Sequence, residues 1–140
     1  MLLNVSPGEI LWLISKNYMN ESGITVSKIL KSTNLKLNKI VIIHDDLDLE
    51  LGKVKIKFGG GNGGHNGLSS IDEMIGNDYY RIRIGIDHPG MKHLVSNYVL
   101  NKFNTDEIKK IDNQIDNITK NFETLLNDTG LFLTKLAEGK

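Results

Sequence analysis

The apolar run Lys-Ile-Val-Ile-Ile at residues 39–43 limits the possible folds most, because almost none of its side chains favours water. Such a run is typical of a strand in the interior of a sheet. Residues 22–37 before it carry apolar side chains at helical spacing, and another apolar run lies upstream at residues 9–14. A strand, a helix and a strand in this order predict a parallel connection and therefore an α/β fold.

Two later segments alternate between apolar and basic residues. Residues 53–58 place lysines on one face of a strand, and residues 80–86 place arginines on one face of another. We expect each basic face to meet solvent or a ligand. After Thr105, apolar residues recur every three or four positions, which predicts an amphipathic helix of about five turns that ends near Gly130, with a short helix after it.

The length and composition exclude several classes of protein. At 140 residues, we expect residues 1–140 to form a single domain with its own core. The absence of cysteine excludes disulfides, a thiolate nucleophile and cysteine-bound zinc. Basic and acidic residues both number 17, so no overall positive charge indicates a nucleic-acid partner. Residues 1–7 lack the features of a secretion signal and no long apolar stretch follows, so we expect a cytoplasmic protein without a membrane segment.

The stretch Gly-Gly-Gly-Asn-Gly-Gly-His-Asn-Gly at residues 59–67 lies between a predicted strand and a predicted helix. Its spacing matches the dinucleotide fingerprint, but the strand before it is amphipathic rather than buried, and no Gly-Lys-Ser/Thr follows to make a P-loop. A loop with so few side chains lets the backbone of a large ligand approach closely, with His65 and Asn66 as polar groups at its end. The alternative is a mobile surface loop.

A histidine and three carboxylates, His44, Asp45, Asp46 and Asp48, follow the run at 39–43. They therefore lie at the carboxyl end of a strand, where ligands bind in open α/β sheets. Clustered carboxylates suit magnesium, one carboxylate could orient a basic histidine, and an aspartate could simply cap the amides of a turn. His44 itself is a poor partner for Asp45, because neighbours on a strand point to opposite faces.

Two further segments carry polar groups next to expected helices or turns. Asn20 and Ser22 lie just before the helical segment, where they could cap the helix or hold a substrate carbonyl. His-Pro-Gly at 88–90 predicts a tight turn, and Lys92 beside it could contact a phosphate.

Taken together, motifs along most of the chain resemble bacterial peptidyl-tRNA hydrolases in order and spacing. They are Tyr-Met-Asn-Glu-Ser-Gly at 18–23, His-Asp-Asp-Leu-Asp-Leu at 44–49, the glycine-rich stretch with Leu at 59–68, Arg-Ile-Arg-Ile-Gly-Ile at 81–86, His-Pro-Gly at 88–90 and Tyr-Val-Leu at 98–100. The resemblance implies a monomeric α/β fold with a twisted, mixed sheet flanked by helices, and no metal or other cofactor. It also implies hydrolysis of the ester between a peptide and the terminal ribose of tRNA, which rescues stalled translation and recycles tRNA.

The resemblance also assigns catalytic roles. It implies that Asp45 stabilises the basic histidine and that Asn20 and Asn66 hold the substrate at the ester. In such a reaction a neutral histidine takes a proton from water, the water attacks the ester carbonyl, and amide donors stabilise the developing oxyanion.

The substrate-binding assignments follow from the same comparison of motifs. The resemblance implies that Tyr18 lines the substrate channel and that His65 supports the site beside Asn66. Lys92 and the lysines at 53–58 are candidates for contacts with the tRNA backbone. Peptidyl-tRNA is therefore the expected partner.

Two segments of the family have no counterpart in this chain: an initial strand leading into Gly-Leu-Gly-Asn-Pro-Gly, and Thr-Arg-His-Asn-x-Gly, whose histidine is the general base. We therefore expect an N-terminally truncated member that lacks the first strand and helix, is inactive without that histidine, and self-associates through apolar surface left open. The alternatives are a non-catalytic tRNA-binding module and a magnesium-dependent phosphohydrolase that uses Asp45, Asp46 and Asp48.

Overall fold

The computed structural model describes residues 8–16 and 18–139. Residues 1–7, whose sequence we interpret as lacking a secretion signal, lie outside the described residues. With η for 3₁₀ helices, the elements follow in the order η1 (Met19–Glu21), α1 (Ser22–Ser32), η2 (Leu37–Lys39), β1 (Val41–Asp46), β2 (Val54–Phe58), α2 (Asn66–Ile75), β3 (Tyr80–Gly85), η3 (Lys92–Leu94), α3 (Val95–Leu100), α4 (Thr105–Lys120), α5 (Phe122–Asn127) and α6 (Thr129–Ala137).

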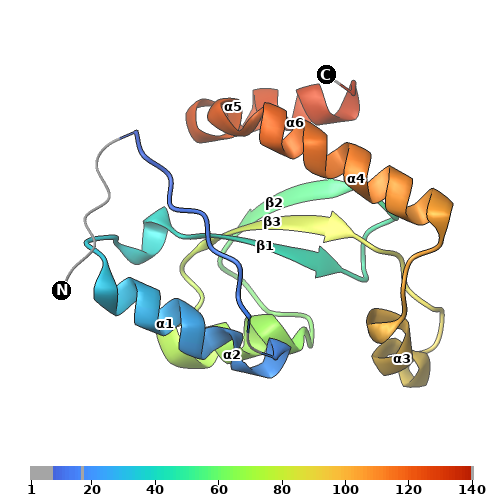
Figure 1. Ribbon diagram of the computed structural model, residues 1–140, viewed down its shortest axis with the longest axis horizontal. Coiled ribbons are helices and arrows are strands. Elements are labelled where there is room, and N and C mark those ends of the chain that lie inside the picture. The colour runs from blue at the N-terminus through green and yellow to red at the C-terminus, as the bar shows by residue number, and fades with distance from the viewer. Residues whose placement is uncertain (1–7, 17, 140) are drawn as a thin grey trace. The chain divides into compact units, whose positions relative to one another are not determined.

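The strands form a sheet of order β1-β3-β2 (Figure 1). The amide of Tyr80 donates to the carbonyl of Ile40 at 3.1 Å. At the other end of the two strands, the amide of Ile86 donates to the carbonyl of Asp46 at 3.0 Å. These bonds advance in the same direction along both strands, so β1 and β3 are parallel.

The pairing of β2 with β3 runs the other way. The amide of Gly59 donates to the carbonyl of Tyr79 at 3.0 Å, just beyond the end of β2. Before its start, the carbonyl of Lys53 accepts from Gly85 at 2.8 Å. The strands are therefore antiparallel, and the β2 arrow points opposite to the other two (Figure 1). The α/β class and the mixed sheet are confirmed.

The position of β1 in the sheet differs from the prediction. Its apolar run indicated a strand in the sheet interior, but among the described residues β1 is an edge strand, and Ile43 is 43 % exposed. An apolar run shows that both faces of a strand can be covered. It does not show how many strands pair with it, which depends on the order of the sheet.

The described chain divides into two compact units. The first unit consists of the residues up to Ile42 and Lys57–Arg81, and the second of Ile43–Ile56 and the residues from Ile82 onward. No helix among residues 8–16 and 18–139 is long and apolar enough to cross a membrane.

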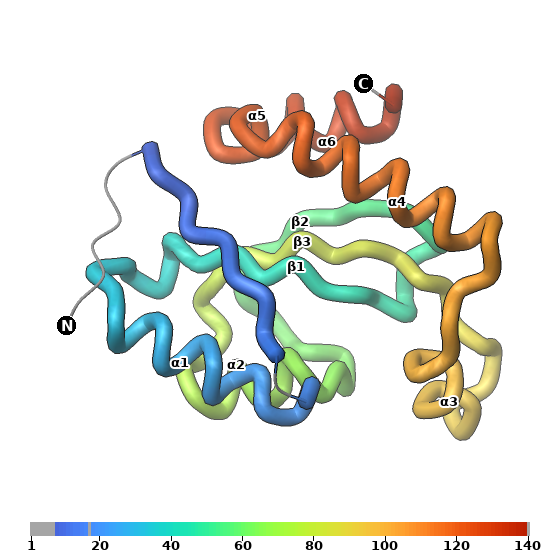
Figure 2. The backbone as a smooth tube through the Cα atoms, in the orientation of Figure 1, coloured from blue at the N-terminus to red at the C-terminus, as the bar shows by residue number. Residues whose placement is uncertain are grey.

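In the first unit α1 and α2 lie side by side (Figure 2). Gly23 permits the close approach, because a Cβ at this position would lie 2.0 Å from the carbonyl oxygen of Ser70. The amide of Gly23 also donates to the hydroxyl of Ser70 at 2.9 Å. Buried Leu68, Ile71 and Tyr79 form the core of this unit, and apolar residues of α1, α2 and β1 pack against them. The apolar residues that recur at helical spacing on α1 and on α2 therefore pack into one shared core.

In the second unit α4 begins with a capping box, in which Asn104 and Glu107 each accept from the backbone amide of the other. Further along, the side-chain amide of Gln114 donates to the carbonyl of Gly52 at 2.8 Å. The predicted five-turn helix is wrong in its length, because it is divided at Asn121. The side chain of Asn121 is buried and donates to the carbonyl of Asn117, which completes the end of α4 locally.

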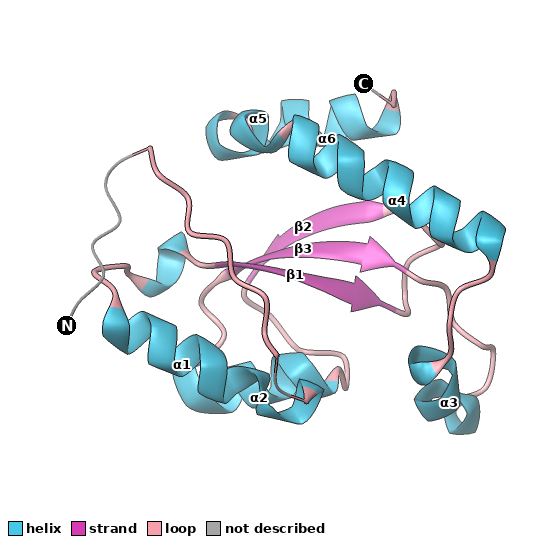
Figure 3. Ribbon diagram, in the orientation of Figure 1, coloured by secondary structure: helices cyan, strands magenta, loops and turns pink. Residues whose placement is uncertain are grey.

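Two other predicted elements also differ. Gly130 ends no helix but lies in the first turn of α6, after Asp128 caps that helix through the amide of Leu131. Residues 9–14 form no strand, and the segment 8–16 has no regular structure (Figure 3). Ile14 is 91 % exposed and Trp12 is 57 % exposed. An apolar run becomes a strand only where a neighbouring strand takes its backbone hydrogen bonds, and this segment pairs with none of the three strands.

Candidate active site

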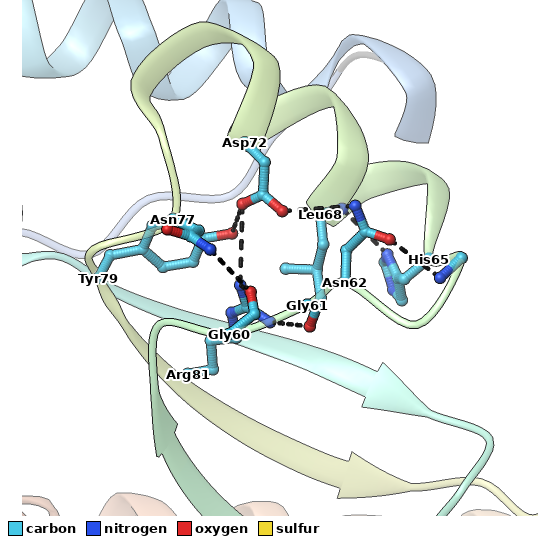
Figure 4. A network of polar contacts seen from close by, with 10 residues as sticks. Gly60, Gly61, Asn62, His65, Leu68, Asp72, Asn77, Tyr79 and Arg81 are labelled. Carbon is cyan, nitrogen blue, oxygen red and sulfur yellow. Dashed lines mark hydrogen bonds and ion pairs between the residues drawn. The ribbon is translucent and has the colours of Figure 1, made fainter.

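The alternation along β3 predicts a basic face that meets solvent or a ligand, but at Arg81 this face is buried. Arg81 is only 2 % exposed. Its Nη1 donates to the carbonyl of Gly61 at 2.7 Å, and its Nη2 donates to the carbonyl of Gly60 at 2.9 Å. The guanidinium therefore holds two successive carbonyls of the glycine-rich loop (Figure 4). The planar fork of an arginine presents its N–H donors in a fixed geometry that suits two acceptors held side by side.

The positive charge of Arg81 has a carboxylate nearby, but beyond hydrogen-bond distance. The nearest carboxylate oxygen, on Asp72 of α2, lies 3.8 Å away, and the ring centroid of Tyr79 lies 5.1 Å from the guanidinium carbon. The same Asp72 oxygen accepts a 2.7 Å hydrogen bond from the hydroxyl of Tyr79. Burial, followed by this hydrogen bond, raises the pKa of Tyr79 well above its usual value, so the hydroxyl stays a donor.

Asn62 connects the loop to α2. Its side-chain amide donates to Asp72 at 3.4 Å, while its side-chain oxygen accepts from the amide of Gly64 at 3.0 Å. Its backbone carbonyl accepts from the amide of His65, also at 3.0 Å. On the other side of the loop, Asn77 donates to the carbonyl of Gly60 at 3.0 Å (Figure 4). The loop is thus bonded at several points, which does not support the alternative of a mobile loop.

His65 and Asn66 form the start of α2. His65 is the N-cap residue, and its Nδ1 accepts from the amide of Leu68 at 3.1 Å. In this role Nδ1 carries no proton, so the ring proton lies on Nε2. Asn66 is the first residue of the helix and its side chain is exposed. His65 and Asn66 thus lie where the glycine-rich loop meets α2.

The segment with Asn20 lies against this helix start. A Cβ on Gly67 would lie 3.0 Å from Cγ of Met19, so η1 packs closely on the first turn of α2. Asn20 follows Met19 in η1 and is exposed. Tyr18, which precedes η1, is 82 % exposed. The structure therefore brings together, within the first unit, the two elements that carry Asn20 and Asn66, and both carboxamides are accessible.

Asp45 belongs to the second unit, on β1, where it is half-buried. Nδ1 of the preceding His44 lies 2.7 Å from the backbone carbonyl of Asp45.

The carboxylate of Asp46 accepts hydrogen bonds from other groups of the protein. Nε of Arg83 donates to one carboxylate oxygen at 2.7 Å, and the amide of Asp48 donates to the other at 2.8 Å. Burial by itself raises the pKa of Asp46, but the bond from Arg83, the bond from Asp48 and the nearby positive charge outweigh it and lower the pKa below its usual value. Asp46 thus caps a turn, which is one of the three interpretations of this cluster.

The magnesium interpretation finds no support in this geometry. Within the described parts of the chain, no three histidine, aspartate or glutamate side chains are arranged to hold a metal ion. Both oxygens of Asp46 already accept hydrogen bonds.

The basic residues expected to meet RNA are exposed. Lys55 and Lys57 alternate with half-buried Val54 and Ile56 along β2, as predicted. Lys92 is exposed in η3 of the second unit.

Tyr98, in the motif at 98–100, is structural. Its hydroxyl donates to the carbonyl of Ile86 and ties α3 to the end of β3 within the second unit. Burial, followed by the charges of Asp87 and Glu107, raises the pKa of Tyr98, so its hydroxyl remains a donor.

The sequence patterns did not identify the residues that hold the loop in place, which are Asn62, Asp72, Asn77, Tyr79 and Arg81. The feature of the sequence that could have indicated these residues is the glycine-rich loop. A glycine-rich segment exposes many backbone carbonyls with few local side chains to satisfy them, so donors must come from elsewhere in the fold. Alternation along β3 indicated instead that the arginines meet solvent or a ligand.

The chain is similar to known proteins of one family. A family model described as peptidyl-tRNA hydrolase matches residues 2–138. The chain is 51 % identical over 118 residues to a peptidyl-tRNA hydrolase of Rickettsia prowazekii, covering 84 % of this chain and 64 % of that protein. It is 49 % identical over 120 residues to one of Rickettsia bellii, covering 86 % of this chain and 65 % of that protein. The chain thus spans just under two thirds of the length of these relatives.

A solved structure is also similar. The crystal structure of peptidyl-tRNA hydrolase from Acinetobacter baumannii matches with a TM-score of 0.70 and 36 % sequence identity, covering 85 % of this chain and 61 % of that chain.

Proposed function

The chain belongs to the peptidyl-tRNA hydrolase family, and we propose that its protein hydrolyses the ester between a peptide and the 3′-terminal ribose of tRNA. One observation carries this proposal: Asn20 and Asn66 are both exposed on two elements that pack together at the start of α2. Two carboxamides so placed can donate to a substrate carbonyl without first losing a partner inside the fold. Hydrolysis would release a peptide carboxylate and a tRNA with a free ribose hydroxyl.

The proposed mechanism uses a histidine base. The base takes a proton from water, the water attacks the ester carbonyl, and Asn20 and Asn66 stabilise the oxyanion. The ester bond then breaks and the base returns the proton to the leaving ribose oxygen. Asp45 would stabilise the protonated histidine. Residues 1–140 contain no counterpart of the family segment that carries this base. We therefore propose that these residues alone bind peptidyl-tRNA but do not cleave it.

The cellular setting is part of the same proposal. Peptidyl-tRNA is the partner, the reaction takes place in the cytoplasm as part of translation, and residues 1–140 act as one domain. Tyr18 would line the channel for the substrate, and His65 would support Asn66 by holding the first turn of α2. Native-state hydrogen exchange tests the single domain, because the slowest amides of both units should exchange at one common rate.

The second candidate, tRNA binding without catalysis, is favoured by the exposed lysines of β2. If Lys55 contacts a phosphate, K55Q should lower the slope of log affinity against log salt by about 0.7 to 0.9, whereas K109Q on α4 should leave the slope unchanged. Equal slopes for K55Q and the parent chain would show that Lys55 contacts no phosphate.

A pair of assays on purified residues 1–140 tests the proposed function. Binding is measured with an acceptor-stem minihelix whose 3′-terminal ribose carries an N-blocked amino acid through an amide in place of the ester. Cleavage is measured with N-blocked aminoacyl-tRNA. Binding without turnover is the expected result. Measurable turnover would contradict the assignment of the base to the family segment that has no counterpart in residues 1–140. Failure to bind the minihelix at low salt would contradict the family's function for this chain.

A further inference from the structure

We propose that Arg81 is a positioning residue for Asn66, acting through the glycine-rich loop at residues 59–64. The inference rests on the proposed function, because Asn66 takes its role from it. Arg81 itself is 2 % exposed, so its guanidinium is not accessible to a phosphate of tRNA. Whatever Arg81 contributes to substrate binding must pass through the groups that it touches.

The bonding pattern of Arg81 indicates that it serves the loop rather than an ion pair. Its two short hydrogen bonds, at 2.7 and 2.9 Å, go to the neutral carbonyls of Gly61 and Gly60. The nearest carboxylate oxygen, on Asp72, is 3.8 Å away. Burying a cation costs free energy that close pairing with a carboxylate normally offsets. Here the geometry places the guanidinium where it orders two peptide groups.

The loop needs such an external restraint. Gly59, Gly60, Gly63 and Gly64 all have positive φ values, which glycine reaches without strain but which leave many alternative conformations open. Asn77 adds a second donor to the carbonyl of Gly60 at 3.0 Å. Two side chains therefore select one conformation of an otherwise permissive segment.

A short series of bonds leads from the restrained carbonyls to the helix. Gly61 is followed directly by Asn62, which accepts from the amides of Gly64 and His65, each at 3.0 Å. His65 then caps α2 through the amide of Leu68. Asn66 is the next residue, and its backbone direction is set by that cap. Loss of the hydrogen bonds to the carbonyls of Gly60 and Gly61 should therefore allow the Asn66 carboxamide to occupy a wider range of positions.

Hydrogen exchange tests the restraint in the free chain, with R81K as the main variant. Lysine retains the charge but lacks the planar fork that donates to both carbonyls in one fixed geometry. We expect the amides of Gly64 and His65 to exchange about tenfold faster in R81K, with no change at the amide of Gly52 in the second unit. R83K is the matched control, because Arg83 bonds to Asp46 and not to the loop. Unchanged exchange at Gly64 and His65 would overturn the proposal.

A double-mutant cycle with the amide-linked minihelix tests the link to Asn66. R81K should weaken binding about tenfold in the parent chain, but less than about twofold when N66A is also present. Equal weakening in both backgrounds would show a general structural role and overturn the inference, while leaving the proposed function intact. If the unsubstituted chain does not bind the amide-linked minihelix, both the proposed function and this inference are contradicted. If R81K does not fold, N77A at the exposed second donor replaces it in both experiments, with the same outcomes.

Discussion

The Nδ1 atom of His65 accepts a hydrogen bond from the backbone amide of Leu68 at 3.1 Å, so a histidine caps α2. Serine, threonine, aspartate and asparagine are the usual residues at this position. We expect H65A to lower the free energy of unfolding by about 1 kcal/mol, because the amide loses its acceptor, and H65N to preserve it. Urea denaturation of the three chains measures the difference. Equal losses for H65A and H65N would show that the cap contributes nothing to stability.

Gly23 marks the contact of α1 with α2. In G23A the new Cβ would lie 2.0 Å from the carbonyl oxygen of Ser70, so the helices must separate. We expect a loss of about 2 kcal/mol or more in the free energy of unfolding. G61A is the control, since a Cβ on Gly61 meets nothing within 4 Å and its φ is not positive. A G23A chain as stable as G61A would contradict the close packing of the two helices.

The ion pair of Asp46 with Arg83 should make stability depend on pH. Because the pKa of Asp46 in the folded chain is below its ordinary value of 3.8, the unfolded chain binds the proton more readily. The contribution is fully present above the unfolded pKa and is lost as the pH falls through the folded pKa. Urea denaturation at pH 5 and below about pH 4 should show a smaller fall for D46N than for the parent chain. Parallel pH profiles would contradict this.

Asn66 can be removed with little effect on folding, because its side chain is exposed. N66A should keep the free energy of unfolding within about 0.5 kcal/mol. It should weaken binding of the amide-linked minihelix by about tenfold, which corresponds to the loss of one hydrogen bond to the substrate. N113A, at an exposed position on α4, should bind like the parent chain. Equal binding by N66A and N113A would remove Asn66 from the site.

The exposed apolar residues at 10–14 should promote self-association. Ile14 is 91 % exposed, and Trp12 and Leu13 are more than half exposed beside it. We expect sedimentation velocity to show association that grows with protein concentration, and I14K to weaken it about tenfold through the loss of about 1.5 kcal/mol of apolar burial. I115K, at a 45 % exposed position on α4, is the control. A monomer at all concentrations would contradict this prediction.

Much of the local structure was predictable. The helical spacing before residue 39 and after Thr105, and the alternation at 53–58, identify element types that the structure contains. These patterns work because a helix or strand repeats its environment at a fixed period. The predictions are wrong where the structure depends on a single residue or on pairing with another strand. Asn121 divides the predicted long helix, and residues 9–14 pair with none of the three strands.

The candidate site was predictable in its residue types but not in its support. The glycine-rich stretch, its position between a strand and a helix, and the adjacent pair of His65 and Asn66 follow from the order of residues along the chain, since backbone freedom and capping are local properties. The burial of Arg81 depends on the fold. Alternation along β3 shows which residues share a face, but not what covers that face. Only the tertiary structure brings the carbonyls of Gly60 and Gly61 over the guanidinium, because those contacts join residues about twenty positions apart.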